Sequence, residues 1–183
     1  MGASDEELML AYAGGDARAF EALYGKHKGA LYRYVLRSVK TGGEAEELFH
    51  DVWLRAIEAR ARYTPQAKFT TWLYTIAHNR LVDHWRARGL ALVSLDDAES
   101  VPELAAPPSS QPQLQLEARR TLERLAAAIA ALPLAQREAF LLHQEAGLEL
   151  AEIAALTGAG VETIKSRIRY AVAKLRVELG DLQ

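Results

Sequence analysis

The sequence contains no cysteine and no long apolar run, and each absence excludes a class of protein. Without cysteine there is no disulfide framework, no cysteine-ligated zinc finger and no thiol catalysis, which fits a reducing compartment. No apolar stretch approaches the roughly 20 residues that a membrane-spanning helix needs, and the acidic start, residues 1–6, lacks a signal-peptide hydrophobic region. We therefore expect a cytoplasmic protein without membrane insertion.

The usual enzyme and metal motifs are missing as well. The 183 residues contain no His-x-x-x-His pair, no glycine-rich phosphate loop and no nucleophile elbow. His78 and His84 are six residues apart, which places them about 120° from each other on a helix, too far to chelate one ion. Asp83 precedes His84 directly, and neighbouring helical side chains point apart. The sequence therefore predicts no enzyme and no metal site, and it implies no cofactor.

What the chain does have is helical periodicity. Half of its residues are hydrophobic, enough for packed cores, and no segment shows a strand pattern. The periodicity, with capping and breaking residues, predicts a short helix from Ser4 to the Gly14-Gly15 pair and a long one after Asp16. Further helices are expected at about 44–60, 70–88, 114–131, 133–146, 149–156 and 161–179. His27 lies on an apolar stripe, so we expect a core or boundary residue rather than a ligand.

Prolines divide these helices into two groups. Four of the six prolines fall in residues 89–116, where every charged residue is acidic. This composition is typical of a linker. The predicted fold is therefore all-α, with two small helical domains, 1–88 and 117–183, joined by a flexible linker at 89–116, and with a helix-turn-helix in the C-terminal domain.

The helix-turn-helix prediction rests on the segment from Leu148 to Leu179. A short apolar helix, a glycine-containing turn at residues 157–160 and a second helix match the module that places its second helix in the DNA major groove. The second helix has an apolar back, and its residues 165–176 include five cations and no acid. An ordinary helical hairpin with a solvated basic face is the alternative.

Two further segments separate charge in a way that the net charge of −2 conceals. Residues 60–88 hold six basic residues and one acidic residue among several aromatic rings, the mixture that binds single-stranded DNA. Aromatic residues such as Trp72 and Tyr74 also suit a helical core, which is the simpler explanation for any one of them. Residues 44–58 hold five acidic residues and one basic residue, which favours a basic protein surface as partner.

Four segments in order resemble the extracytoplasmic-function group of bacterial RNA polymerase sigma factors, the smallest of the sigma-70 type. Residues 16–24 resemble the start of the family's region 2, and residues 44–53 resemble its helix for the polymerase clamp. Residues 69–80 with Asp83 resemble the segment that meets the −10 promoter element. Residues 131–138 with the helix-turn-helix resemble region 4, which reads the −35 element.

The resemblance implies a transcription initiation factor that does no chemistry. Its expected partners are core RNA polymerase, which it binds at the clamp and the flap, promoter DNA and an anti-sigma factor. The family reads −35 as duplex and captures unstacked −10 bases as the strands part, with the loop at about 60–69 holding a flipped base. In the family the acidic linker threads the polymerase channels, whereas its composition alone favours a plain tether.

The expected site residues form three sets. The −35 set is Glu162, Thr163, Lys165, Ser166, Arg167, Arg169 and Tyr170. The −10 set is Arg60, Tyr63, Lys68, Phe69, Trp72, Asn79, Arg80, Asp83 and Arg86. The core-polymerase set is Glu46, Glu47, His50, Asp51 and Trp53. Two positions depart from the family's usual residues, because His50-Asp51 stands where a Gln-Glu pair is common and Tyr170 where Arg is common.

Two rival functions remain open. A free-standing helix-turn-helix regulator shares the C-terminal half, but it needs a dimer interface or effector pocket and leaves residues 60–88 unexplained. A protein-binding adaptor explains residues 44–58 but gives the basic helix no purpose.

Overall fold

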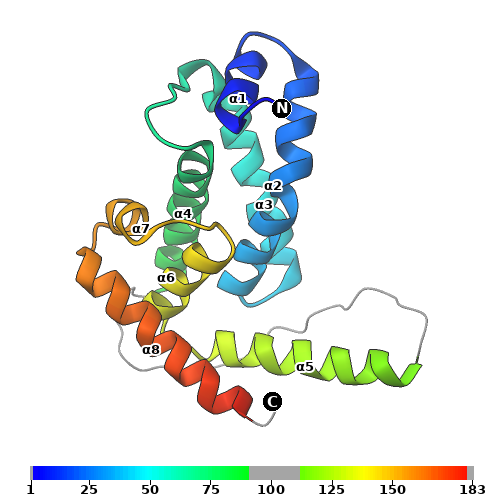
Figure 1. The fold of residues 1–183 in the computed structure, drawn as a ribbon, viewed down its shortest axis with the longest axis vertical. Helices are drawn as coiled ribbons and strands as arrows, with labels where there is room; N and C mark the ends of the chain where they lie inside the picture. The colour runs from blue at the N-terminus through cyan, green and yellow to red at the C-terminus, as the bar shows by residue number, and fades with distance from the viewer. Residues whose placement is uncertain (1, 91–111, 181–183) are drawn as a thin grey trace.

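The computed structural model describes residues 2–90 and 112–180, except for the side chains of residues 112–118. Within these ranges the chain forms eight α-helices, one short 3-10 helix and no strand (Figure 1). The elements are α1 Asp5–Ala13, α2 Ala17–Ser38, α3 Gly42–Ala59, η1 Arg60–Arg62, α4 Phe69–Ala87, α5 Pro112–Ala130, α6 Leu134–Gln144, α7 Leu150–Thr157 and α8 Val161–Leu179. The expected all-α fold is confirmed.

Local hydrogen bonds explain why α1, α2 and α3 begin where they do. Ser4 and Thr41 form capping boxes with the glutamates three residues later, and Asp16 accepts a hydrogen bond from the Arg18 backbone N–H at the start of α2. Such caps satisfy backbone N–H groups that have no partner inside the helix. Between α7 and α8, Gly158 has a φ of +70°, a left-handed conformation that glycine adopts without steric cost.

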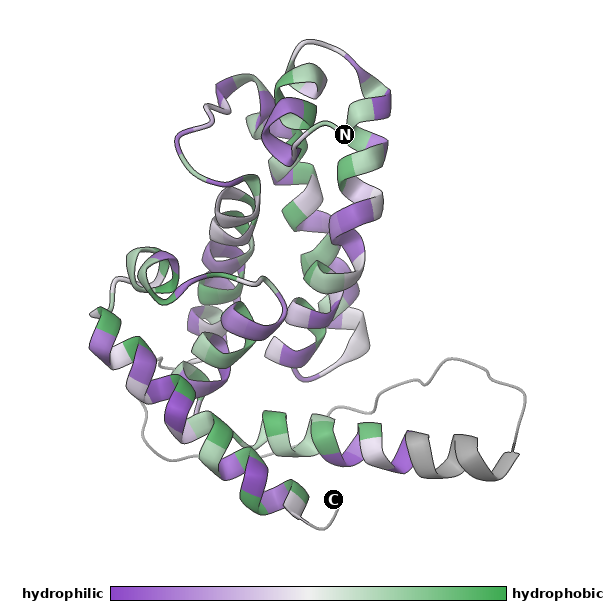
Figure 2. Cartoon of the chain, viewed as in Figure 1, coloured by the Kyte–Doolittle hydropathy of each residue, from purple (hydrophilic) through white to green (hydrophobic). Residues whose placement is uncertain are grey.

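The first helical block consists of α1 to α4. Apolar and polar residues alternate along its helices (Figure 2), and the apolar sides meet in a core that includes Leu31, Leu73 and Tyr74, each at most 1% exposed. Trp85 closes this core near the end of α4 and donates a hydrogen bond from its indole N–H to the Ser38 carbonyl oxygen at 3.1 Å. The block therefore holds α3 and α4 in fixed positions beside each other.

The second block consists of α5 to α8. Its core is formed by Ile129, Leu141, Leu148 and Ile164, all at most 2% exposed. α8 packs against α5, α6 and α7, which fixes the two helices of the helix-turn-helix relative to the rest of the block.

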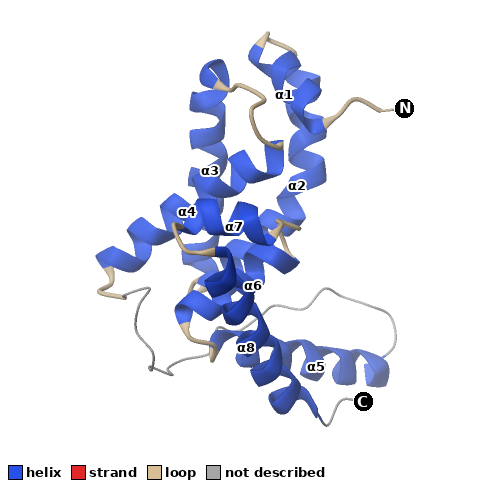
Figure 3. Ribbon diagram, turned by 60° about the vertical axis from the view of Figure 1, so that its left-hand side comes forward, coloured by secondary structure: helices blue, strands red, loops and turns tan. Residues whose placement is uncertain are grey.

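The two blocks pack directly against each other, α2 against α5 and α6, and α4 against α7, as both ribbon views show for α4 and α7 (Figures 1 and 3). A buried His78 Nδ1 is hydrogen-bonded to Glu138 of α6. At the edge of this contact, Glu145 accepts from Arg33 Nε at 2.8 Å and from Arg37. Polar side chains thus connect the blocks from several positions along α2 and α4.

The expected linker, 89–116, is only partly open to comparison. Residues 91–111 lie outside the described residues, while α5 begins at Pro112, inside the predicted linker. Proline is well tolerated in the first turn of a helix, where its missing N–H has no partner to lose, so a proline-containing stretch is a poor guide to this boundary. In the described parts of the chain, none of the helices combines the length and apolarity that a bilayer span requires.

Candidate nucleic-acid interface

The outer face of α8 carries the expected −35 residues. Ile164, Ala171 and Leu175 are buried against the block, so the opposite face of the helix is open to solvent. Glu162, Thr163, Lys165, Arg169 and Tyr170 are exposed, and Ser166 and Arg167 are half-buried. The structure therefore gathers the whole predicted set on the first three turns of one helix.

The charge on this face is mostly uncompensated. Lys165 Nζ lies 3.7 Å from a carboxylate oxygen of the exposed Glu162, a contact that water and salt readily replace. The Arg169 guanidinium lies over the exposed Tyr170 ring, 5.1 Å from the ring centroid, so both side chains stay on the outer face of the helix. An exposed guanidinium on a helix of this shape is suited to pair with the edge of guanine in the major groove.

The aromatic residues of the expected −10 set divide into buried and accessible rings. Phe69 is 1% exposed and Tyr63 is 6% exposed, and both belong to the core of the first block. Trp72 is only partly buried and packs edge-on against Tyr63 at 5.1 Å between centroids. Burial, with the nearby carboxylates of Glu6 and Asp5, raises the pKa of Tyr63. Of the aromatic rings between residues 60 and 88, Trp72 is thus the one with accessible surface.

The polar residues of the −10 set follow one side of α4. Asn79, Asp83 and Arg86 are exposed at intervals of three or four residues, so they form a continuous stripe. Arg80 is half-buried beside them and pairs with Asp51 of α3, and its Nη1 lies 3.6 Å from Asp83. Arg80 and Asp51, predicted for two different interfaces, therefore meet each other in this structure.

The acidic helix α3 presents its expected polymerase residues unevenly. Glu46, Glu47 and His50 are exposed, Asp51 is half-buried and Trp53 is 5% exposed within the core. The expected set therefore comes together on one helix, with Trp53 turned inward.

Sequence reasoning missed Leu54, which is 58% exposed on α3. Leu54 follows Glu47 by seven residues and His50 by four, so it shares their face of the helix. A leucine at that spacing from acidic residues was the available signal.

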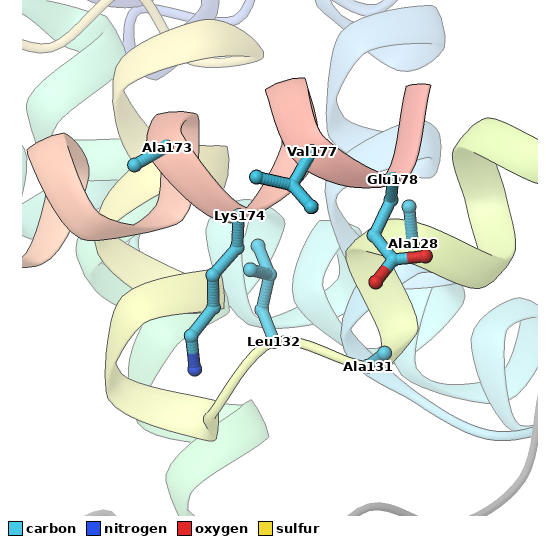
Figure 4. Close-up of a pocket in the computed structure, with 7 residues that line it drawn as sticks. All are labelled: Ala128, Ala131, Leu132, Ala173, Lys174, Val177 and Glu178. Atoms are coloured by element: carbon cyan, nitrogen blue, oxygen red, sulfur yellow. The ribbon is translucent and has the colours of Figure 1, made fainter. Parts of the chain in front are cut away.

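A groove between α5 and α8 was also missed. Its volume is about 460 Å³, and Figure 4 shows its lining residues, Ala128, Ala131, Leu132, Ala173, Lys174, Val177 and Glu178. Val177, which lines the groove, is 80% exposed. A groove lined mainly by apolar side chains, one of them so exposed, suits contact with another protein.

Part of the −10 surface is covered by the second block. Lys68 Nζ lies 3.4 Å from a carboxylate oxygen of Glu149 and 3.5 Å from one of Glu152, and the Thr71 hydroxyl donates to Glu152 at 2.9 Å. The hydrogen bond with Glu149 and the charges of both glutamates raise the pKa of Lys68. The beginning of α4 therefore lies beside α7, while the Lys68 side chain itself stays exposed.

No group of three or more His, Cys, Asp or Glu side chains in residues 2–90 and 119–180 has the geometry of a metal site. His27 is buried, as expected of a core residue, and its Nε2 is hydrogen-bonded to Asp5 at 2.8 Å. His78 is hydrogen-bonded to Glu138 between the two blocks, so both buried histidines hold neighbouring helices together.

Comparison with protein families gives two matches along the chain. Residues 23–90 match the model for sigma-70 region 2, and residues 122–175 match the model for sigma-70 region 4. The first range contains α3, α4 and most of α2. The second contains α6, α7, most of α8 and the end of α5.

Curated relatives match over nearly the whole length. The RNA polymerase sigma factor CarQ of Myxococcus xanthus is 32% identical over 176 residues, 96% of this chain and 97% of CarQ. The ECF RNA polymerase sigma factor SigL of Mycobacterium tuberculosis is 32% identical over 174 residues, 93% of this chain and 94% of SigL. The ferric citrate uptake sigma factor FecI of Escherichia coli is 33% identical over 153 residues, 84% of this chain and 86% of FecI.

Solved structures share the fold. CnrH in complex with the cytosolic domain of CnrY matches with a TM-score of 0.70 at 24% identity, over 98% of this chain and 99% of CnrH. The sigma factor RpoE of Bartonella quintana, in complex with the anti-sigma factor NepR, matches with a TM-score of 0.70 at 25% identity, over 90% of this chain and 98% of RpoE.

Proposed function

Because the chain belongs to the extracytoplasmic-function group of sigma-70 RNA polymerase sigma factors, and so directs core polymerase to promoters, we propose that its two blocks divide promoter recognition between them. The observation that carries this division is the presence of two separate polar surfaces, one on α8 and one on α4 with its preceding loop. Residues 1–88 form the −10 domain and residues 117–183 the −35 domain.

α8 reads the −35 element as duplex DNA in this proposal. Its buried back holds the first turns outward, where Lys165, Ser166 and Arg169 reach base edges in the major groove. Glu162, Thr163, Arg167 and Tyr170 complete the contact surface on both sides of these three residues.

α4 and the loop before it receive the −10 strand after the bases separate. Trp72 offers a ring for stacking, while Asn79 and Asp83 offer hydrogen bonds to base edges. Arg60, Lys68, Arg80 and Arg86 neutralise phosphates along the strand. Tyr63 and Phe69 support this surface from inside the core.

Core RNA polymerase contacts the protein at two places. The clamp binds the acidic face of α3, where Glu46, Glu47, His50 and Leu54 are exposed around Asp51. Opposite charges and one exposed leucine suit a basic partner surface with an apolar centre. The flap occupies the apolar groove between α5 and α8.

The remaining parts of the proposal follow from the family. Sigma factors are initiation factors and no enzyme class is known among them, so this protein acts by binding alone, in the cytoplasm where the polymerase lies. An anti-sigma factor is a further partner, supported by the complex of the RpoE neighbour with NepR.

Asn79→Ala tests the assignment of α4. We expect the holoenzyme carrying this variant to bind a promoter duplex normally and to open it poorly, because unpaired bases are contacted only after separation. Permanganate reactivity of −10 thymines measures opening, and Arg86→Ala is the matched control that shifts affinity and its salt dependence instead. Full opening by Asn79→Ala would remove this face from the −10 interface.

A further inference from the structure

The loop between α3 and α4 is held at both ends by α1, a helix that lies outside the matched region 2, residues 23–90. At the start of the loop, the Arg60 guanidinium lies over the Tyr12 ring at 5.5 Å from its centroid. At its end, Glu6 Oε1 accepts a hydrogen bond of 2.7 Å from the Phe69 backbone N–H. Two residues of α1 thus touch the two residues that border the loop.

The contact with Phe69 caps α4 from a distance of 63 residues in the chain. Lys68, the residue at the N-cap position of α4, makes no side-chain cap of its own. A carboxylate at the N-terminus of a helix satisfies a free N–H and meets the positive end of the helix dipole. The hydrogen bond from the Phe69 backbone N–H lowers the pKa of Glu6, because it favours the charged carboxylate.

The neighbouring Asp5 fixes the ring of the same phenylalanine. Asp5 accepts from His27 at 2.8 Å and from Lys26 at 2.7 Å, and the His27 ring packs on the Phe69 ring at 5.2 Å between centroids. Phe69 is therefore restrained through its backbone by Glu6 and through its side chain by the Asp5–His27 pair.

We propose that Glu6 and Tyr12 of α1 are positioning residues that set the shape of the −10 loop, residues 60–68, for the separated strand. This inference rests on the proposed role of the loop at the −10 element. It assigns to α1 a task in strand capture that depends on one carboxylate oxygen and one aromatic ring.

The test compares Glu6→Ala with Glu6→Gln, using Glu7→Ala as the matched control. Glu7 is hydrogen-bonded to Ser4 in the capping box of α1 itself, so its loss weakens α1 without removing the cap of α4. The templates are a promoter that the wild-type holoenzyme transcribes and the same promoter with mismatched −10 strands. Loss of one helix cap predicts about fivefold weaker binding of the mismatched template by Glu6→Ala.

We expect Glu6→Gln to bind within about twofold of wild type, because its carbonyl oxygen still accepts from Phe69. Affinity for core polymerase stays unchanged in all three variants. Amide hydrogen exchange at Phe69 in the free protein, faster in Glu6→Ala alone, tests the cap independently of promoter function. Equal template binding by Glu6→Ala and wild type, or an equal loss in Glu7→Ala, overturns the proposal. Wild-type holoenzyme that binds the mismatched template no better than core polymerase alone overturns the −10 assignment itself.

Discussion

At the scale of single residues, the proposed −35 contact depends most on the difference between Arg169 and Arg176 of α8. Both residues are exposed on the same face of the helix, Arg169 in the third turn and Arg176 about two turns further along. In the proposed function the first residue touches base edges and the second meets only phosphates.

Arg169→Ala is therefore expected to reduce the preference for a true −35 sequence over a scrambled one by about ten- to a hundredfold, the value of one bidentate base contact. Arg176→Ala weakens binding to both sequences equally, because charge attraction carries no sequence information. Binding titrations of the holoenzyme on both duplexes measure the two ratios. An identical specificity ratio in the two variants would leave α8 with a purely electrostatic role.

Three carboxylates, Asp5, Glu6 and Glu152, make stability depend on pH. Burial by itself raises the pKa of Asp5 and Glu152, but hydrogen bonds and nearby cations bring both below their ordinary values. Hydrogen bonds with the Phe69 and Glu6 backbone lower the pKa of Glu6. A carboxyl whose pKa is lower in the folded state stabilises the fold above its unfolded pKa, about 4. That contribution disappears as pH falls through the folded pKa.

We expect the free energy of unfolding to fall between about pH 5 and pH 3, and to fall less steeply in Asp5→Asn, which has no carboxyl to protonate. Urea denaturation at a series of pH values measures both slopes. Parallel slopes in Asp5→Asn and wild type would show that Asp5 titrates alike in the folded and unfolded chain.

At the scale of the element, α3 has exposed residues that can be changed without disturbing the packing of the helix. Glu46 and Glu47 are exposed, while Asp51 holds Arg80 and Arg55, so reversing Asp51 would also disturb the packing of α4. Charge reversal is therefore most informative at the two glutamates.

Glu46→Lys/Glu47→Lys is expected to weaken core polymerase binding by at least about tenfold at low salt, and by less at high salt, because screening already weakens the wild-type contact. The exposed Glu21 of α2 provides the control, since Glu21→Lys changes charge on another helix. Titration of labelled protein with core polymerase gives the affinities, and circular dichroism checks the fold. Unchanged affinity of the double variant would place the clamp elsewhere.

The turn between α7 and α8 depends on one backbone conformation. Gly158 has a φ of +70° and open space where a Cβ would lie, so a substitution meets backbone strain without a steric clash. Gly158→Ala is expected to cost about 1–2 kcal/mol and Gly158→Asn less, because asparagine visits the left-handed region more easily. Urea denaturation measures the difference, and an alanine variant as stable as wild type would contradict it.

These elements show how far the sequence alone reaches. Capping residues and apolar periodicity predicted every α-helix of the described residues to within a few residues, because both signals are local to the chain; the 3-10 helix η1 falls in the expected loop. The burial of Tyr63, Phe69 and Trp53 was not distinguishable from exposure, since aromatic residues serve cores and interfaces equally well. The contacts of Glu6 with Phe69 and of His78 with Glu138 join residues more than 50 positions apart, and no local pattern announces such pairs.

At the scale of the whole molecule, the proposed function gives each block one surface for DNA and one for polymerase. The apolar groove of the second block and the acidic face of α3 belong to different blocks, so we expect polymerase to gain one contact on each. Binding through two linked contacts is stronger than either contact alone, provided that both are reached at once.

The most direct test of this account is transcription in vitro by purified bacterial core RNA polymerase on a library of random DNA sequences, with and without the protein. The account predicts transcripts that require the protein, with start sites preceded by two shared motifs, one near −35 and one near −10. Arg169→Ala should weaken the sequence preference of the motif near −35, and Asn79→Ala should reduce the number of transcripts without changing that motif. Transcripts no more abundant than with core polymerase alone, or start sites with no shared upstream motif, would contradict the central claim.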